Sequence, residues 1–319
     1  MNTTPLQLAL DFNVPVATAL DDQSPRERRL DEARATLARG FAGVRDDPET
    51  LAAYLRFAAR FTELSTRNRM LVFLQDPAAR WVKGYRAWQK AGRQVRKGER
   101  ALTILAPLLR KPTADEVAAG ADPDRRVPFG YRAVHVFDIS ATDAVHEGAL
   151  ELASPVVRLD ADGPAGLAER LEAAAGALGY TVEELSRGSA DGRCRFADRV
   201  IEVRTGLSPA DRAAVLAHEL AHALAHDPAG DPAGKCEAAT RASAELQAES
   251  VGFTVCAALG LDTERASLPY LKDWAGGDDD ALCAELAAID RIATRLLALV
   301  DRASESTNVD SPMSPATPS

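Results

Sequence analysis

Residues 217–222 read AHELAH and carry the strongest structural signal in the chain. On an α-helix, His218 and His222 lie one turn apart, about 6 Å along the axis, so both imidazoles project from one face with Glu219 beside them. Catalytic zinc requires such a pair of neutral imidazoles, a third ligand from elsewhere and an open position for water next to a carboxylate. The stretch therefore predicts a Zn²⁺ site held by His218 and His222, with Glu219 as the base that takes a proton from the water.

The flanking sequence predicts a buried helix around this stretch. Ser208 is a suitable N-cap, Pro209 suits the first helical position, and Asp211 stands at the third. Apolar residues then recur at helical spacing, namely Ala213, Val215, Leu216, Leu220, Ala223 and Leu224. Because a buried unpaired polar group is costly, histidines on such a helix need partners.

A second apolar helix downstream carries the carboxylates Glu245 and Glu249 and ends at a candidate C-cap, Gly260. Because residues four apart share a helix face, one carboxylate can bind the metal while the other accepts a hydrogen bond from a ligand histidine. An exposed charged stripe is the alternative. The spacing resembles that of gluzincin peptidases, and this resemblance implies Glu245 as the third ligand and Glu249 as the hydrogen-bond partner of a ligand.

His226 extends the histidine row by one more turn. It would lie about 12 Å from His218 along the helix, which is too far for both to bind one ion. We expect a capping or surface residue near the helix end, with contact to substrate as the alternative.

The composition is that of an ordinary globular protein. With 319 residues, of which 46% are hydrophobic and 27% charged, the chain is long enough for two domains. No apolar run reaches membrane-spanning length and the N-terminus lacks a signal-peptide pattern, so a cytoplasmic protein with no membrane partner is expected. The cysteines lack C-x-x-C spacing, which favours reduced thiols over disulfides at Cys194, Cys236, Cys256 and Cys283.

One segment is strongly basic, although the net charge of -9 argues against attraction of nucleic acid to the whole surface. Residues 80–111 contain ten basic side chains and one acid, interleaved with aromatic rings. Cations for the phosphates and flat rings for unpaired bases are what single-stranded DNA requires. The alternative is that the tryptophans belong to the core and the charges only solvate a surface. On the first interpretation, the candidate DNA-binding residues are Trp81, Tyr85, Arg86, Trp88, Arg93, Arg96, Lys97 and Arg100.

The periodicity of the N-terminal half predicts helices and a hairpin. The expected helices cover residues 24–40, 47–64 and 68–75, and the expected strands cover residues 101–109 and 131–139. The two strands are joined by a long polar excursion, so we expect a hairpin with a long loop.

Several short motifs in this half resemble the N-terminal single-stranded-DNA-binding domain of the antirestriction protein ArdC and its relatives. They are NRML at 68–71, GYRAW at 84–88, GR at 92–93, VRKGE at 95–99 and VFDIS at 136–140. The similarity covers about residues 27–145, and the downstream histidine and glutamate motifs are similar to those of ArdC and of ImmA/IrrE-type peptidases. The resemblance implies a DNA-binding domain followed by a zincin-like metallopeptidase domain.

We therefore expect an α+β protein, with a small helix and β-hairpin DNA-binding domain followed by a zincin-like metallopeptidase domain. In zincins a strand before the metal helix lines the cleft and pairs with an extended peptide, and residues 201–203 are the candidate. Residues 270–274 are a candidate cleft wall. The expected boundaries are a flexible arm over 1–23, the DNA-binding domain over 24–145, the peptidase domain over 155–302 and a disordered tail over 303–319.

Together these features indicate a single-stranded-DNA-binding zinc metallopeptidase, related to antirestriction and mobile elements, that acts on a protein or peptide substrate. Two alternatives stay open: a non-enzymatic protein that protects single-stranded DNA and uses zinc for folding, and a regulatory peptidase that cleaves a repressor. The presence of Glu219 favours an enzyme, because a purely structural metal site needs no base.

Overall fold

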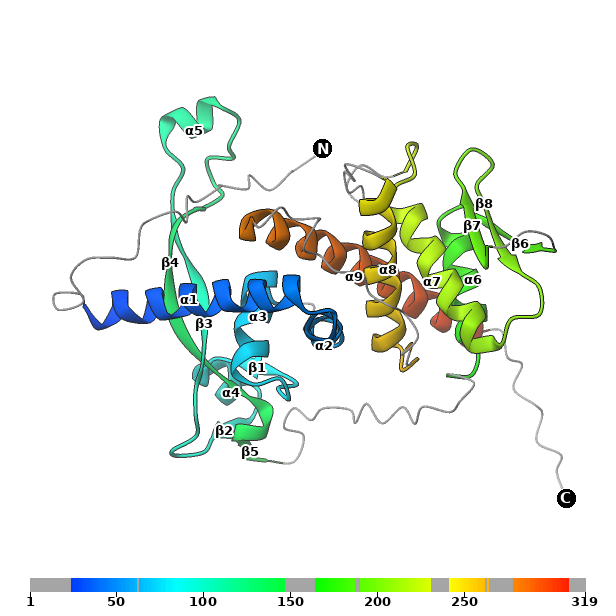
Figure 1. The fold of residues 1–319 in the computed structure, drawn as a ribbon. Coiled ribbons are helices and arrows are strands. Elements are labelled where there is room, and N and C mark those ends of the chain that lie inside the picture. Colours follow the sequence, from blue (N-terminus) through cyan, green and yellow to red (C-terminus); the bar gives the residue numbers. More distant parts are fainter. Residues whose placement is uncertain are drawn as a thin grey trace, which may run out of the picture.

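The computed structural model describes residues 24–61, 63–146, 164–186, 190–230, 241–261, 263 and 278–309. The expected arm, Cys236, the candidate cleft wall at 270–274, residues 147–154 between the expected domains and residues 310–319 of the expected tail lie outside the described residues. The chain mixes helices and strands (Figure 1), which confirms the expected α+β class. Among the described helices, none combines the length and the apolar character that a membrane span requires.

The first half begins with three helices, each started by a capping side chain. The helices of this half are α1 (Pro25–Asp46), α2 (Pro48–Ala58), α3 (Thr66–Gln75), α4 (Tyr85–Lys90) and α5 (Ala114–Ala118). Ser24 forms a capping box with Glu27 at the start of α1. The side chains of Asp47 and Ser65 accept backbone N–H groups at the starts of α2 and α3. The expected starts at residues 24 and 47 agree with these caps, whereas α3 begins at Thr66, two residues before the expected start, and α2 ends at Ala58, short of the expected end at residue 64.

Gly40 does not end α1, so the expected helix end at this residue is wrong. A Cβ at Gly40 would lie 2.5 Å from Cδ1 of Leu74 and 2.7 Å from Sδ of Met70, both on α3. The glycine therefore lets α1 pack closely on α3, and the helix continues to Asp46. The sequence shows a glycine at this position but not which helix faces it.

The strands of the first half form a long antiparallel ribbon and a small side unit. In Figure 1, β3 (Leu102–Arg110) and β4 (Val127–Asp138) run side by side, with α5 at the tip. β1 (Val82–Lys83) pairs with the end of β4. β2 (Arg93–Val95) pairs with β5 (Thr142–Ala144), and this two-stranded pair is the small side unit. The expected hairpin with a long loop is confirmed.

Side-chain amides of α3 satisfy the second edge of β3. Asn68 accepts the N–H of Leu105 at 2.8 Å and donates to the carbonyl of the same residue at 3.0 Å. Gln75 makes the same two bonds with Thr103, both at 2.8 Å. A strand edge with unsatisfied backbone groups invites pairing with another chain, so these amides close the edge that faces the helices.

The described residues of the second half form a three-stranded sheet and four helices. These elements are α6 (Leu167–Ala177), β6 (Thr181–Leu185), β7 (Gly192–Arg195), β8 (Val200–Arg204), α7 (Pro209–Ala225), α8 (Arg241–Ala258) and α9 (Asp279–Val309). The strand order is β6-β8-β7, with β8 parallel to β6 and antiparallel to β7. Residues 201–203 therefore lie in the central strand, and the expectation that they form an edge open to a peptide is wrong. The parallel strand β6, which follows α6, occupies that side of β8.

Helix α9 joins the two halves. It continues beyond Arg302 to Val309, so the first residues of the expected tail are helical. Figure 1 shows α9 running from the side of α3 to a position beside α6 and α7, and buried side chains of both halves form one hydrophobic core. Arg69 on α3 forms a buried ion pair with Asp290 on α9, with Nη1 and Oδ1 2.7 Å apart. The two halves are thus packed together within the described residues.

Candidate metal centre and nucleic-acid surface

The candidate metal centre lies where α7 and α8 pack against each other. Ser208 caps α7 by accepting the N–H of Asp211, as the sequence predicted. Gly252 on α8 allows the two helices to approach closely, because a Cβ there would lie 3.3 Å from the backbone nitrogen of His218. This close contact brings the carboxylates of α8 within reach of the imidazoles of α7.

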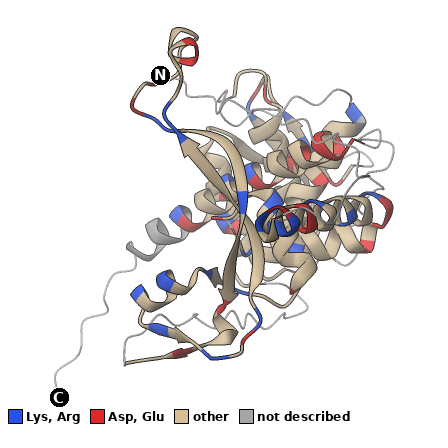
Figure 2. Ribbon diagram, turned by 90° about the vertical axis from the view of Figure 1, so that its left-hand side faces the viewer, with Lys and Arg blue, Asp and Glu red and all other residues tan. Residues whose placement is uncertain are grey.

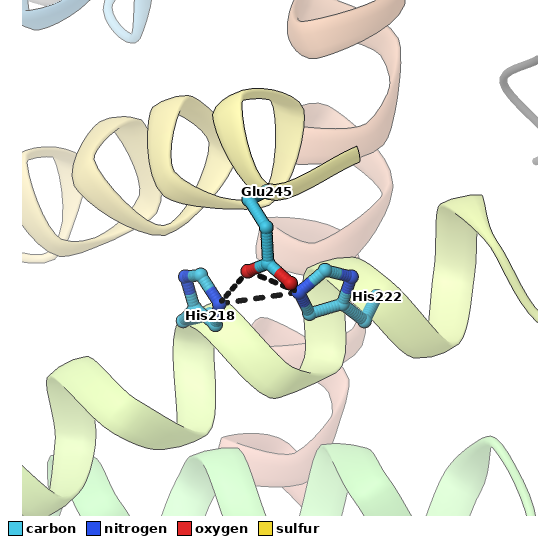
Figure 3. Close-up of side chains that lie close together, drawn as sticks. All are labelled: His218, His222 and Glu245. Atoms are coloured by element: carbon cyan, nitrogen blue, oxygen red, sulfur yellow. Dashed lines mark hydrogen bonds and ion pairs between the residues drawn. The ribbon is translucent and has the colours of Figure 1, made fainter. Parts of the chain in front are cut away.

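Three potential ligand atoms form a compact triangle (Figure 3). Nε2 of His218 and Nε2 of His222 are 3.2 Å apart, and Oε2 of Glu245 lies 3.5 Å from the first and 3.3 Å from the second. Metal–ligand bonds of about 2.0–2.1 Å at tetrahedral angles separate two ligand atoms by about 3.3 Å. The spacing and the donor types therefore fit a divalent metal ion. Glu245 is half-exposed, which leaves this side of the triangle accessible to solvent.

Each imidazole has a partner on the nitrogen that faces away from the triangle. Oε2 of Glu249 lies 3.2 Å from Nδ1 of His218, and Nδ1 of His226 lies 3.0 Å from Nδ1 of His222. Burial and the neighbouring His218 lower the pKa of His222 to about 4, so this imidazole is neutral at pH 7, the form that binds metals. Burial also acts to lower the pKa of His218, but the hydrogen bond with Glu249 and the nearby carboxylates outweigh it and raise that pKa.

Glu219 is buried between α7 and β7, with 6% of its surface exposed. The backbone N–H of Cys194 on β7 bonds to its carboxylate, and a Cβ at Gly192 would lie 2.7 Å from its Oε1. Burial raises the pKa of Glu219 to about 7, while His218 opposes the shift. A carboxyl group with such a pKa exchanges protons near neutral pH, as general acid–base catalysis requires.

His226 is the C-cap of α7 and lies outside the triangle, which confirms the expected capping position. Its Nε2 lies 2.8 Å from Oε1 of Gln247, whose Nε2 donates to Oε2 of Glu285 at 2.8 Å. Neither Gln247 nor Glu285 was expected at the site from the sequence. A polar residue amid the apolar positions of α8 was the one available signal for Gln247, whereas nothing local in the sequence places Glu285 of α9 beside it.

Trp88 is not a base-stacking residue in this structure, so that assignment is wrong. Its side chain is 0% exposed, and its Nε1 donates to the carbonyl of Phe137 at 2.8 Å. The ring packs edge-to-face on Trp81, with centroids 6.2 Å apart. Trp81 is only half-buried, and the ammonium of Lys83 lies 5.0 Å from its ring centroid. Trp88 is therefore a core residue, whereas part of the Trp81 side chain is accessible to solvent.

Two arginines of the candidate DNA-binding set make hydrogen bonds or ion pairs with other residues of the protein. Arg93 donates from Nε to Oγ1 of Thr142 at 2.7 Å. Arg96 forms ion pairs with Glu99 at 2.7 Å and Asp143 at 3.0 Å. These contacts tie β2 to β5, so both arginines stabilise the small side unit, and less of their charge is available to phosphates.

The remaining basic residues of the candidate DNA-binding set lie at the surface, as does Tyr85. Arg86, Lys97 and Arg100 are exposed, and none of them makes an ion pair within the described part of the chain. Tyr85 is also exposed on α4, where its hydroxyl accepts a hydrogen bond from Gln94. In Figure 2, blue residues gather on the small unit below the ribbon. The structure thus reduces the candidate phosphate-binding groups to a smaller, exposed set.

Two family models match the chain, one in each half. The N-terminal domain of anti-restriction factor ArdC matches residues 31–137, and the peptidase M78 model, an IrrE N-terminal-like domain, matches residues 175–271. The protein pXO2-81 of Bacillus anthracis, described as uncharacterized, is 24% identical over 269 residues, which are 74% of this chain and 44% of that relative. The chain therefore spans less than half the length of this relative.

Two solved structures of the antirestriction protein ArdC from plasmid R388 are also similar. The Mn(II)-bound structure is 19% identical, with a TM-score of 0.51, over 88% of this chain and 99% of that chain. The metal-free structure is 20% identical, with a TM-score of 0.47, over 75% and 86% of the two chains. The likeness to the Mn(II)-bound structure shows a shared fold. With an ArdC N-terminal domain followed by an IrrE-like, peptidase-type domain, this chain is an ArdC-like protein.

Proposed function

We propose that this ArdC-like chain is a zinc metallopeptidase that also binds single-stranded DNA. The observation that carries the peptidase part is the triangle of His218, His222 and Glu245 next to the buried acid Glu219. Two imidazoles and one carboxylate, with one side open, are a donor set that suits catalytic zinc. Manganese is the competing ion, because the R388 ArdC structure is described as Mn(II)-bound.

The proposed chemistry is hydrolysis of a peptide bond. A divalent ion bound at the triangle would lower the pKa of a water molecule and polarise the peptide carbonyl. Glu219 accepts a proton from the attacking water and passes it to the leaving amine. Glu249 holds Nδ1 of His218 and thereby directs Nε2 toward the triangle.

The strand β7 is the proposed site for the substrate backbone. It is an edge of the sheet β6-β8-β7, and its Gly192 lies against Glu219 without a side chain between them. An extended peptide that adds to this edge would therefore pass close to the proposed base. We thus assign to β7 the pairing with an extended peptide that was expected for residues 201–203.

Metal analysis of the purified chain tests the ligand set. We expect about one zinc ion per chain in the parent protein and a large loss in His222→Ala and Glu245→Gln. Glu169→Gln is the matched control, because Glu169 is exposed on α6. Full occupancy in Glu245→Gln would show that another residue is the third ligand, with Glu249 the next candidate.

The variant Glu219→Gln separates proton transfer from metal binding. The amide nearly keeps the shape of the carboxylate and lacks its basicity, so we expect bound metal and an intact fold without cleavage of a peptide library. Unchanged cleavage would point to another base. If the parent binds metal but cleaves nothing, with or without single-stranded DNA, the non-enzymatic DNA-protecting alternative is the better one.

The proposed DNA surface consists of Arg86, Lys97 and Arg100, with Tyr85 and the accessible part of Trp81 as stacking groups. Exposed cations without internal ion pairs attract phosphates, and flat rings accept unpaired bases. Arg93 and Arg96 support this surface by tying β2 to β5. We therefore expect the full chain to bind a single-stranded oligonucleotide more tightly than duplex DNA.

Fluorescence anisotropy with a labelled oligonucleotide tests this surface. Arg86→Ala with Lys97→Ala should weaken binding and reduce the slope of log Kd against log salt by about 1.4, since each single-strand phosphate contact contributes about 0.7. The control is Arg291→Ala with Arg302→Ala, which removes the same charge from exposed positions of α9. Equal loss in both pairs would mean that only net charge matters, and no loss in the first pair would refute the assignment.

A further inference from the structure

A chain of hydrogen bonds leads from the candidate metal triangle to a helix that supplies none of its ligands. Nδ1 of His222 lies 3.0 Å from Nδ1 of His226, and Nε2 of His226 lies 2.8 Å from Oε1 of Gln247. Nε2 of Gln247 then donates to Oε2 of Glu285 at 2.8 Å. The chain thus crosses from α7 to α8 and ends on α9.

The donors and acceptors of this chain can be arranged in only one direction when both imidazoles are neutral. The carboxylate of Glu285 only accepts, so the amide nitrogen of Gln247 faces it and the amide oxygen faces His226. His226 must then carry its proton on Nε2 and accept on Nδ1, which requires His222 to donate from Nδ1. A neutral His222 with its proton on Nδ1 has its lone pair on Nε2, the atom that faces His218 and Glu245.

Burial supports a specific role for Gln247. Its side chain is 0% exposed on α8, and a buried amide is costly unless its oxygen and nitrogen both find partners. The two partners present are His226 and Glu285. Gln247 therefore depends on both partners, and it acts on the ligand His222 only through His226.

We propose that His226, Gln247 and Glu285 are positioning residues that fix the tautomer and ring orientation of His222, a proposal that rests on the metal site proposed above. His218 is held by the carboxylate of Glu249 directly, whereas His222 is held through two neutral groups that end on the carboxylate of Glu285. Partners of this kind change metal affinity about 10- to 100-fold when they are lost. α9 thus contributes to the metal site without touching the ion.

Metal affinity, measured by competition with a chromophoric zinc chelator, tests the proposal. We expect Gln247→Leu to weaken zinc binding about 10- to 100-fold, because it removes the acceptor of His226 and the donor to Glu285. Glu285→Ala, at a half-buried position on α9, should weaken it in the same direction and serves if Gln247→Leu does not fold. The control is Ser250→Ala, which changes a buried polar residue on the same helix and should leave zinc affinity unchanged.

A rescue variant separates positioning from general packing. Gln247→Glu together with Glu285→Gln keeps an oxygen facing His226 and keeps a hydrogen bond between positions 247 and 285, with its donor now at position 285, so zinc affinity should return to near the parent value. Gln247→Glu alone brings two carboxylates together and should remain weak. The visible absorption spectrum of the Co²⁺-substituted protein should change in Gln247→Leu and recover in the exchanged pair.

The outcomes distinguish this proposal from the function on which it rests. If the parent and Gln247→Leu bind zinc equally while His222→Ala does not, the metal site stands and the positioning role is overturned. If the parent binds neither Zn²⁺ nor Co²⁺, both the metal site and the positioning role fall. If the exchanged pair binds zinc as weakly as Gln247→Leu, the proposed hydrogen-bond chain does not position His222, and the residues act only through packing.

Discussion

The contact between the two halves of the chain leads to a quantitative prediction at Asp290. On α9, its Oδ1 lies 2.7 Å from Nη1 of Arg69, and its Oδ2 accepts the hydroxyl of Thr66 at 2.8 Å. The side chains of Arg69 and Asp290 are 6% and 7% exposed, so water and salt screen the pair only weakly. We expect Asp290→Ala to lower the free energy of unfolding by about 3–5 kcal/mol.

Most of this loss would come from the charge and the hydroxyl that stay buried, and less from the net attraction within the pair. Burial raises the pKa of Asp290, and Arg69 and Thr66 offset that effect only in part. The ionised pair is therefore costly to desolvate, and a buried hydroxyl that loses its acceptor costs about 1–3 kcal/mol more. Arg69→Met combined with Asp290→Leu, which removes both charges, should recover more than half of the loss.

Urea denaturation measures these differences. Far-UV circular dichroism follows the whole chain, while tryptophan fluorescence reports mainly on the first half, where Trp81 and Trp88 lie. A shift of the fluorescence transition in Asp290→Ala would show that α9 stabilises the first half. The matched control is Asp280→Ala on the same helix, because Asp280 pairs with Arg67 at 2.8 Å with both side chains more exposed, and such surface pairs contribute about 0–1 kcal/mol.

Two results would contradict the expected effect of Asp290→Ala. The first is an Asp290→Ala chain within about 0.5 kcal/mol of the parent, the range of an ordinary surface substitution. The second is a double variant less stable than Asp290→Ala, which would mean that the charge on Arg69 is stabilising without its partner.

Three further predictions concern single residues. Asp138 accepts three backbone N–H groups at 2.8–2.9 Å, so Asp138→Asn should cost about 2 kcal/mol at neutral pH. Burial raises the pKa of Asp138, but the hydrogen bond from the side chain of Ser140 and the three from backbone N–H groups outweigh it and hold the pKa below its ordinary value. The resulting stabilisation is complete above the unfolded-state pKa and is lost as pH falls through the folded-state pKa, so Asp138→Asn should flatten the acid side of thermal melts recorded against pH. Gly252→Val should push α8 away from His218 and weaken zinc binding by about tenfold or more in chelator competition, and unchanged affinity would contradict the close helix contact. Gly40→Leu should separate α1 from α3 and lower the free energy of unfolding by about 1–3 kcal/mol, whereas Gly43→Ala, with a single ordinary contact, should cost nothing in the same urea titration.

Features that depend on near neighbours in the chain could be predicted from the sequence. Ser24, Asp47 and Ser208 start helices because their side chains accept N–H groups two or three residues later, and such caps can be read from a few positions. The spacing of His218 and His222 likewise places both imidazoles on one helix face whatever surrounds the helix. The alternating segments that became β3 and β4 were recognised for the same reason.

The third ligand of the metal site could be predicted only in part from the sequence. The i and i+4 spacing showed that Glu245 and Glu249 share a face, but both carboxylates satisfied that condition equally. Packing of α8 on α7 at Gly252 decided that Glu245 reaches the Nε2 atoms and that Glu249 reaches Nδ1 of His218. The distinction depends on the crossing of two helices, which no local pattern specifies.

Which groups are buried and which elements are neighbours became known only from the packing of the folded chain. Trp88 lies in the core although it belongs to the most basic segment, and residues 201–203 are central because the parallel strand β6 covers their other side. His226 is linked to Glu285 through Gln247 because α7, α8 and α9 pack together. Caps and periodicity are set by contacts between residues a few positions apart, whereas burial, strand order and hydrogen bonds between helices depend on contacts between residues far apart in the chain, and these are selected by the packing of the whole core.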